Sequence, residues 1–339
     1  MTNLSRREFI GAAAGAAVAS GAITSPLPLR AFGRTGERLP ILAIGCGNRL
    51  WAAYVQEERG LEALNLAFDM GIRYFDTAQG YGNGISETWV GKANKGRRNE
   101  VMLATKTGAR KYDDVLARCE ESLKRLQTDH LDVYHIHGLN YEEEVDQIEA
   151  LGTVRALRRL RDEKVIRFMG VTSHTDPTAL AKALDRYDFD VTQVAVNAGL
   201  QGRSPDGAGY WKKGGNSDLF GEPIAPKPYP GESFQDIALP VAVRKNIAVI
   251  GMKTTGQESL VGDGSGKASG EQLIRYALSL PVSMVSVGMP KLDFIRRNVA
   301  LAKSFQPMPK SEMDSLSTRL SQANKMALDY HFHHEHRDS

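Results

Sequence analysis

Eight short apolar runs recur along this chain, and amphipathic segments separate them. Several of the runs are almost continuously apolar, which is typical of parallel strands buried on both faces. In residues 113–126, by contrast, the apolar positions follow helical spacing. Strands alternating with helices in a chain of 339 residues predict an α/β fold, a (β/α)8 TIM barrel. The predicted strands are 41–47, 72–78, 101–106, 131–137, 167–173, 191–197, 247–253 and 282–288.

A shorter pair of strands is expected before the barrel. Residues 27–32 and 38–42 flank a segment with Gly33 and Gly36, and this pattern predicts an antiparallel hairpin with a tight turn. We expect this N-terminal β-hairpin to cover the bottom of the barrel.

The chain begins with two adjacent arginines and a small-residue apolar run, SRREFIGAAAGAAVASGA. Arg6 and Arg7 supply a charged region, and 17–19 or 20–22 fits a cleavage site between small residues. Ser5 to Ile10 resembles the twin-arginine (Tat) export signal. The alternative is an ordinary N-terminus with a chance pair of arginines. We therefore predict a signal peptide over 1–22, a barrel domain over 27–310, and a C-terminal helix with a His-rich tail over 311–339.

Composition removes several classes of function. Apolar residues make up 42% of the chain and charged residues 24%, so disorder is not expected. The 43 basic and 40 acidic residues leave a net charge of +3, which gives no case for nucleic-acid binding or an anionic membrane surface. The two cysteines, Cys46 and Cys119, are too few for a disulfide framework or an iron–sulfur cluster, and we expect both to be buried.

Polar residues stand where the predicted strands end. In such a barrel the C-terminal strand ends form one rim, where catalytic groups gather. Each of these residues alone has an ordinary structural explanation, but together they place an acid, two bases and hydroxyl groups on one rim. They are Asp76, Lys106, His137, Thr172, Ser173 and Lys253.

The loop after the second predicted strand reads DTAQGYGNGISE, residues 76–87. Its three glycines let the chain turn back, so that Tyr81 reaches over the barrel mouth. Ser86 is expected to be the N-cap of the next helix, with Glu87 in its first turn.

This segment resembles the D-T-A-x-x-Y-G-x-x-x-S-E signature of aldo-keto reductases. The segments FGRTGERLPILAIGCG, SLKRLQTDHLDVYHIHG and ALSLPVSMVSVGMP are also similar to that family, so the resemblance runs from about Leu29 to Asn298. It implies a catalytic tetrad of Asp76, Tyr81, Lys106 and His137.

The chemistry of these residue types agrees with carbonyl reduction. A tyrosine with a pKa near ~10 stays protonated at neutral pH and can donate to a developing alkoxide. Lys106 would stabilise the phenolate, Asp76 would hold Lys106, and His137 would orient the substrate oxygen. His135 lies on the same side of its strand one layer lower. We interpret it as barrel interior, at a position that is usually apolar or amide in the family.

The resemblance also implies a nicotinamide cofactor, NADP(H), with NAD(H) as the alternative. Three positions depart from the family pattern. Thr172 and Ser173 replace the frequent Ser–Asn pair, and Met252 stands where an aromatic ring is common. Lys291, with Arg296 and Arg297, would supply charge for a 2′-phosphate. The implied cofactor-binding residues are Asp76, Thr172, Ser173, Gln193, Met252, Lys253, Gly288, Lys291 and Asn298.

The sequence therefore predicts an oxidoreductase that reduces an aldehyde or ketone and is periplasmic or otherwise exported. The expected partners are a small-molecule carbonyl substrate, the Tat translocon during export, and an unidentified redox partner. The alternative is a non-catalytic cofactor-binding or regulatory barrel of the same family. A metal-dependent hydrolase using Asp76 and His137 is disfavoured because Tyr81 and Lys106 would then have no role, and we expect no metal site.

Two segments of the chain each allow two interpretations. Residues 199–231 are rich in Gly and Pro, and form either a functional lid, with Tyr210, Trp211 and Phe220 lining a pocket, or a variable insertion. Four histidines in 331–336 either bind a metal or belong to a solvated tail, which we favour.

Overall fold

The computed structural model describes residues 23–203 and 232–334, with side chains described up to Asp329. The predicted signal peptide (1–22), most of the segment 199–231 with its three aromatic residues, and the histidine side chains of the tail lie outside the described residues. The predictions made for those parts stay predictions.

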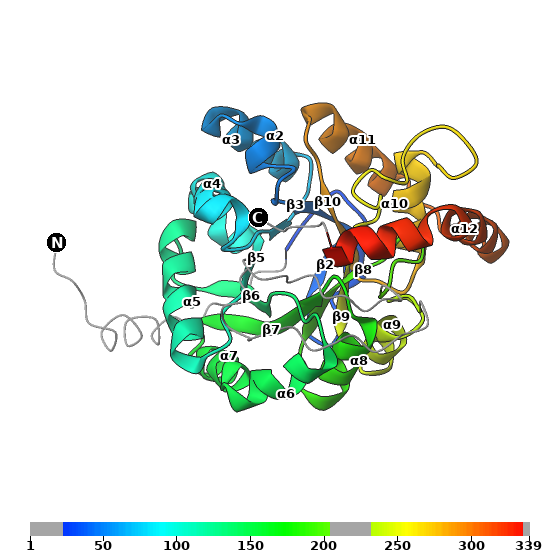
Figure 1. The fold of residues 1–339 in the computed structure, drawn as a ribbon. Coiled ribbons are helices and arrows are strands. Elements are labelled where there is room, and N and C mark those ends of the chain that lie inside the picture. Colours follow the sequence, from blue (N-terminus) through cyan, green and yellow to red (C-terminus); the bar gives the residue numbers. More distant parts are fainter. Residues whose placement is uncertain (1–22, 204–231, 335–339) are drawn as a thin grey trace.

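Eight strands close into a parallel barrel, with helices around it (Figure 1). The order around the barrel is β10-β3-β4-β5-β6-β7-β8-β9, and every neighbouring pair is parallel. The predicted TIM barrel is confirmed, because each apolar run supplies one strand. The strands are β3 (Leu42–Gly45), β4 (Tyr74–Asp76), β5 (Met102–Thr107), β6 (Leu131–Ile136), β7 (Ile166–Ser173), β8 (Val191–Ala195), β9 (Ala248–Met252) and β10 (Met284–Gly288).

The helices pack their apolar faces on the outside of the barrel. In α5, Val115, Cys119, Leu123 and Leu126 are buried, as the helical spacing predicted. Both cysteines are buried and free, also as expected. The helices are α2 (Trp51–Tyr54), α3 (Glu57–Asp69), α4 (Ile85–Asn94), α5 (Tyr112–Leu126), α6 (Glu142–Ala150), α7 (Thr153–Asp162), α8 (Pro177–Arg186), α9 (Ala238–Arg244), α10 (Gly270–Ser279), α11 (Leu292–Lys303) and α12 (Lys310–His334), with 3₁₀ turns η1 (Tyr81–Gly84) and η2 (Lys95–Glu100).

The N-terminal hairpin is present and closes the barrel bottom. Its strands β1 (Leu29–Ala31) and β2 (Arg38–Pro40) are antiparallel and shorter than predicted. Phe32 and Leu39 are fully buried in the same cluster as interior barrel residues, among them Tyr74. Gly33 has φ +57°, and a Cβ there would lie 2.3 Å from the backbone nitrogen of Ala248, so only glycine fits this turn.

At the opposite end of the barrel, α12 lies beside the loops that follow β8 and β9. Asp329 accepts a hydrogen bond from the backbone N–H of Gly202 (2.7 Å), and Lys325 donates to the carbonyl of Leu200 (2.6 Å). Leu328 is buried in one cluster with Ala198 and Leu260. In Figure 1 this helix crosses the open end of the ribbon barrel, so it borders the rim where the predicted site lies.

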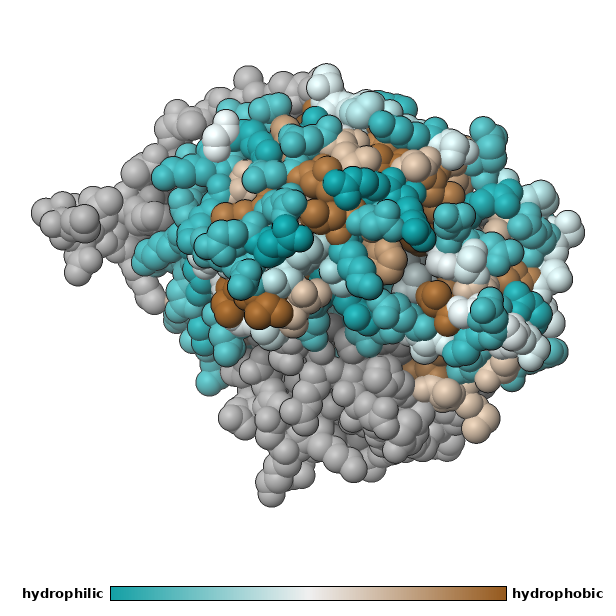
Figure 2. Space-filling view, turned by 90° about the horizontal axis from the view of Figure 1, so that it is seen from above, coloured by the Kyte–Doolittle hydropathy of each residue, from teal (hydrophilic) through white to brown (hydrophobic). Residues whose placement is uncertain are grey.

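Hydrophilic residues predominate among the coloured residues of the face shown in Figure 2, and hydrophobic residues form separate small areas there. Within the described ranges, none of the helices is both long enough and apolar enough to cross a membrane.

Candidate active site

Asp76 is the last residue of β4, and Lys106 stands one strand away on β5. Lys106 Nζ donates to Asp76 Oδ1 (2.6 Å), to the Thr77 carbonyl (2.8 Å) and to Tyr81 Oη (3.4 Å). An ammonium has three N–H donors, so these contacts use all of them. Both side chains are buried, which makes the ion pair mutually dependent: either charge alone would be costly there.

The charge of Asp76 is set by its surroundings. Burial alone would raise its pKa, but the Lys106 ammonium and hydrogen bonds from Lys106 and Gln193 outweigh burial and hold the pKa of Asp76 below its usual value. Asp76 is therefore an ionised carboxylate at neutral pH, and Lys106 has a fixed counterion.

Tyr81 is carried by a tight turn next to this pair. Gly82 has φ +59°, and a Cβ on it would lie 2.8 Å from the ring of Trp51. Glycine therefore lets the chain fold back under Trp51 and brings the phenol to Lys106, as the sequence predicted. Tyr81 itself is half-buried.

The expected N-cap at Ser86 is wrong. Helix α4 begins at Ile85, and its N-cap is Gly84, with φ +92°. Because this left-handed glycine starts the helix early, Ser86 lies inside the first turn. Its buried hydroxyl donates to the Cys46 carbonyl (2.6 Å) and bonds with the Thr77 hydroxyl (2.7 Å). Glu87 is in the first turn, as expected.

His137 directly follows β6 and completes the group. Its ring lies 6.0 Å from the Tyr81 ring, edge-on at 82°, and 5.9 Å from the ring of His174. The structure therefore brings Asp76, Tyr81, Lys106 and His137 together at the C-terminal end of the barrel. Two of them are buried and two are half-buried, so the phenol and the imidazole are the members accessible from the rim.

The predicted carboxamide-binding hydroxyls of Thr172 and Ser173 are both buried and engaged with the loop after β6. Thr172 Oγ1 accepts from the Gly138 N–H (2.9 Å), and Ser173 Oγ donates to the Leu139 carbonyl (2.6 Å). Both lie at the end of β7. Their contacts position the loop that follows His137, and their role toward a cofactor stays a prediction.

Gln193, on β8, contacts Asp76, and its predicted role toward the cofactor stays a prediction. Its Nε2 donates to Asp76 Oδ2 (2.6 Å), and the side chain is buried. In this arrangement the Gln193 amide nitrogen is committed to the carboxylate that holds Lys106.

The remaining predicted cofactor residues surround the ends of β9 and β10. Met252 and Gly288 are the last residues of these neighbouring strands, and Lys253 follows Met252. Lys291 is the exposed N-cap residue of α11, and Asn298 lies on that helix. They occupy one sector of the rim, which begins beside Asp76 because β10 is followed around the barrel by β3 and β4.

The sequence interpretation missed three residues of this site. Ser286 donates to Asp76 Oδ2 (3.0 Å) from β10, Trp51 covers Gly82, and the ring of His174 faces His137. Ser286 was detectable as the polar residue at an inward position of an apolar strand. Trp51 and His174 carry no such signal, because their loops are placed only by the fold.

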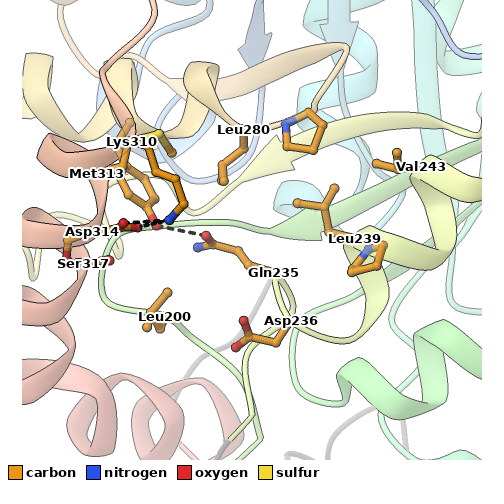
Figure 3. A pocket seen from close by; sticks show the side chains of 13 residues that line it. Leu200, Gln235, Asp236, Leu239, Val243, Leu280, Lys310, Met313, Asp314 and Ser317 are labelled. Atoms are coloured by element: carbon orange, nitrogen blue, oxygen red, sulfur yellow. Dashed lines mark hydrogen bonds and ion pairs between the residues drawn. The ribbon is translucent and has the colours of Figure 1, made fainter.

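A groove elsewhere on the molecule does not include these residues (Figure 3). It lies between α9, α10 and α12, and apolar side chains such as Leu239, Leu280 and Met313 line it. Tyr276 donates to Gln235 across it (3.0 Å), and Lys310 pairs with Asp314. Within the described residues, no three His, Cys, Asp or Glu side chains are grouped as metal ligands would be.

Comparison with known proteins agrees with this geometry. Residues 42–205 match the model of the aldo/keto reductase family. That segment is similar to the aldo/keto reductase family. It contains all four tetrad positions and the strands from β3 to β8.

Curated relatives match less than half of the chain. L-galactose dehydrogenase from Arabidopsis thaliana is 35% identical over 158 residues, which is 43% of this chain and 48% of the relative. The uncharacterized oxidoreductase YqkF from Bacillus subtilis is 32% identical over 157 residues, 42% of this chain and 48% of the relative. The chain thus matches about half the length of these relatives.

Solved aldo-keto reductase structures share the fold over most of this chain. The holo form of AKR11C1 from Bacillus halodurans aligns with a TM-score of 0.64 at 21% identity, covering 88% of this chain and 98% of that one. An aldo-keto reductase from Klebsiella pneumoniae in complex with NADPH aligns with a TM-score of 0.63 at 21% identity, covering 88% and 97%. At this identity the likeness shows the fold.

Proposed function

We propose that this protein is an aldo-keto reductase that reduces an aldehyde or ketone to an alcohol with a nicotinamide dinucleotide, using Tyr81 as the proton donor. One observation carries the proposal: Lys106, fixed by buried Asp76, donates to the phenol oxygen of Tyr81. The family match over residues 42–205 supports it.

The contact between Lys106 and Tyr81 defines what the phenol can do. Since its oxygen accepts from Lys106 Nζ, its own O–H would donate to the oxygen of a bound substrate. When that proton leaves, the adjacent ammonium stabilises the phenolate electrostatically. His137, whose ring lies edge-on to that of Tyr81, would hydrogen-bond the same substrate oxygen and orient the carbonyl carbon.

The rim sector at β9, β10 and α11 fits a dinucleotide. α11 is a 12-residue helix whose N-terminus follows β10 directly, and no side chain caps it. The N–H groups of such an end attract phosphate. Gly288, Lys291 and Asn298 would hold the adenosine end, and Met252 and Lys253 would lie nearer the nicotinamide. When bound, the cofactor supplies the hydride that no side chain can donate.

The preferred cofactor is NADP(H), with NAD(H) as the alternative. Lys291, Arg296 and Arg297 are exposed on and before α11, and they would supply charge for a 2′-phosphate. In the Klebsiella pneumoniae relative of the same fold, the bound cofactor is NADPH.

The test is the turnover of Tyr81→Phe with simple aldehydes and NADPH. Removing a proton donor costs roughly 10²–10⁴-fold in rate, so we expect kcat to fall by that range with cofactor affinity unchanged. Tyr187→Phe is a matched control, because Tyr187 Oη donates only to the Val145 carbonyl (2.8 Å) away from the rim. We expect the control to keep full activity.

A second outcome would assign the alternative function. If the wild-type protein binds NADP(H) or NAD(H) but turns over no aldehyde or ketone, the chain is a cofactor-binding barrel rather than a reductase. If it binds neither dinucleotide, both interpretations fail.

We also propose that residues 1–22 direct export through the Tat translocon and that the protein works in the periplasm. The Tat route carries folded proteins, so the barrel would close around its dinucleotide in the cytoplasm before export, and an unidentified redox partner would regenerate it. Mass spectrometry of protein isolated from the export compartment should find one dinucleotide per chain, and replacing Arg6 and Arg7 with lysine should keep the protein in the cytoplasm.

A further inference from the structure

The loop that follows β6 begins with His137 and is held by neighbouring loops rather than by regular secondary structure. The N–H of His137 donates to the Thr107 carbonyl at the end of β5 (2.9 Å), and the N–H of Leu139 donates to the Thr172 carbonyl at the end of β7 (2.8 Å). Residues 138–140 are buried, so each polar backbone group there needs a partner inside the protein. The N–H groups of the loop are thus bonded to both neighbouring strands.

Two carbonyl groups of the same loop accept from Arg110, which lies between β5 and α5. Arg110 Nη2 donates to the carbonyls of His137 (2.8 Å) and Gly138 (2.6 Å). Arg110 Nη1 donates to the carbonyls of Thr107 (3.4 Å) and Gly108 (3.1 Å). Each of these nitrogens has two N–H groups, so the four contacts use all of them. The planar guanidinium therefore joins the loops after β5 and β6 in one fixed arrangement.

Arg110 is buried to an extent that is rare for a charged side chain. Only 2% of it is exposed. Burial lowers the pKa of Arg110, and the nearby charge of Glu144 acts in the opposite direction. Glu144, in the first turn of α6, also accepts from the Asn140 N–H at the far end of the loop (2.8 Å). Arg110 and Glu144 therefore hold the two ends of the segment 137–140.

We propose that Arg110 is a positioning residue that holds His137 beside Tyr81. The inference rests on the proposed function, in which His137 orients the substrate oxygen. The backbone of His137 is fixed on both sides, because its N–H donates to Thr107 and its carbonyl accepts from Arg110. A fixed backbone keeps the imidazole edge-on to the phenol, with 6.0 Å between the ring centres. Arg110 thus acts on the reaction through His137 and not on the substrate.

A second arginine joins the same two strands at their other ends. Arg98 donates to the carbonyls of Val101 (3.2 Å) and His130 (3.0 Å), which directly precede β5 and β6. It also pairs with Asp132 (2.8 Å). Replacing Arg98 removes contacts of the same kind between β5 and β6, but at the end of the barrel opposite the tetrad. Arg98→Met is therefore a matched control for Arg110→Met.

The first test measures the loop and does not depend on activity. Native-state hydrogen exchange, followed by mass spectrometry, compares the amides of 137–140 in wild type and both variants. We expect them to exchange about tenfold faster in Arg110→Met, because opening of the loop no longer breaks the contacts to the guanidinium. Arg98→Met should leave their exchange unchanged. Equal protection in Arg110→Met and wild type would overturn the inference.

The second test is kinetic. We expect Arg110→Met to lower kcat about 10–100-fold, since a misplacement of about 1 Å in an orienting group can cost 10²-fold. The KM for the dinucleotide should not change, because its predicted residues lie at β9, β10 and α11. Arg110→Lys keeps the charge and three donors but not the planar fork, so its kcat should lie between those of Arg110→Met and wild type. A purely space-filling role predicts no such rescue, and Arg98→Met should keep the wild-type kcat.

A double-mutant cycle tests whether Arg110 acts through His137. In a His137→Ala background there is no imidazole to position, so Arg110→Met should change kcat by less than about twofold. A loss as large as that in the wild-type background would show that Arg110 acts on another group, and the proposed role would be wrong.

The outcomes separate this inference from the proposed function. If Tyr81→Phe is inactive and Arg110→Met keeps both its kcat and its amide protection, the positioning role is wrong and the reductase stands. If wild type reduces no carbonyl, the reductase fails, and hydrogen exchange alone decides whether Arg110 holds the loop. If Arg110→Met does not fold, Arg110→Lys is used in its place in all three experiments.

Discussion

Glu144 shows at the scale of a single residue how burial sets a charge near neutral pH. Its carboxylate accepts from the backbone N–H of Asn140 (2.8 Å), in the loop after His137. Burial raises its pKa to about 7, and the Arg110 charge and the Asn140 hydrogen bonds offset only part of that rise. Glu144 therefore changes its charge close to the site within the physiological pH range.

The titration of the Glu144 carboxyl should be visible in the pH dependence of the free energy of unfolding. In the folded state Glu144 keeps its proton up to about pH 7, whereas the unfolded chain loses it near 4.5. Its stabilising contribution is thus complete below pH 4.5 and is lost as the pH rises through 7. The loss is about 3 kcal/mol for a shift of this size. Compared with Glu144→Gln, wild type should lose this much unfolding free energy between pH 4.5 and 7 in denaturant titrations.

Parallel titration curves for wild type and Glu144→Gln would contradict this account. A useful control is Glu62→Gln, since Glu62 is an exposed partner of Arg59 on α3. We expect that change to leave the pH dependence of stability unaltered, because exposed ion pairs contribute little.

At the scale of elements, β7 and β6 fit together through a glycine and a ring. Gly170 is paired in register with His135, and a methyl group on it would clash with the imidazole. Overpacking of this kind typically costs about 1–3 kcal/mol. We therefore expect Gly170→Ala to destabilise the protein by that amount.

A double-mutant cycle isolates this contact. In a His135→Ala background the imidazole is gone, and Gly170→Ala should cost much less unfolding free energy than in wild type. An equal loss in both backgrounds would show that the methyl group meets something other than the ring. The four proteins are compared by urea denaturation at one pH.

The turn that carries Tyr81 shows the same dependence on neighbouring elements. Its glycines make the reversal possible, yet the position of the phenol is fixed by Trp51 of α2 against Gly82 and by Lys106 of β5. A loop sequence by itself permits many paths, and only packing selects the one that brings Tyr81 to Lys106.

At the scale of the whole molecule, the barrel is closed at its bottom by the hairpin. Phe32 is fully buried, 5.8 Å from the ring of Tyr74, and Arg167 joins Glu37 of the hairpin segment to Asp132 of β6. The hairpin therefore contributes to the core of the barrel and lies at the end opposite the tetrad.

Phe32→Ala should consequently separate stability from activity. Loss of a buried phenylalanine typically costs about 3–5 kcal/mol. We expect a lower thermal midpoint and, at temperatures where the variant is folded, a kcat close to that of wild type. A large fall in kcat at low temperature would contradict this expectation. It would mean that the N-terminal hairpin is coupled to the tetrad through Tyr74 and Asp76.

Much of this protein was determined by its sequence alone. The eight strands follow from apolar runs, because burial on both faces leaves a continuous signal. The ion pair of Asp76 and Lys106 follows from residues at strand ends, because parallel strands in a barrel finish on one rim. That His137 and Tyr81 join this pair was expected from the resemblance to aldo-keto reductases.

Other features were decided only by the tertiary structure. Ser86 is a local N-cap candidate in sequence, but Gly84 starts the helix and turns the hydroxyl inward. The hydrogen bond from the Gln193 amide to Asp76, 117 positions away in the chain, was not expected from the sequence. Such contacts depend on the stagger between distant strands, which sequence spacing does not encode, so only the closed barrel could show that Gln193 and Ser286 both donate to Asp76.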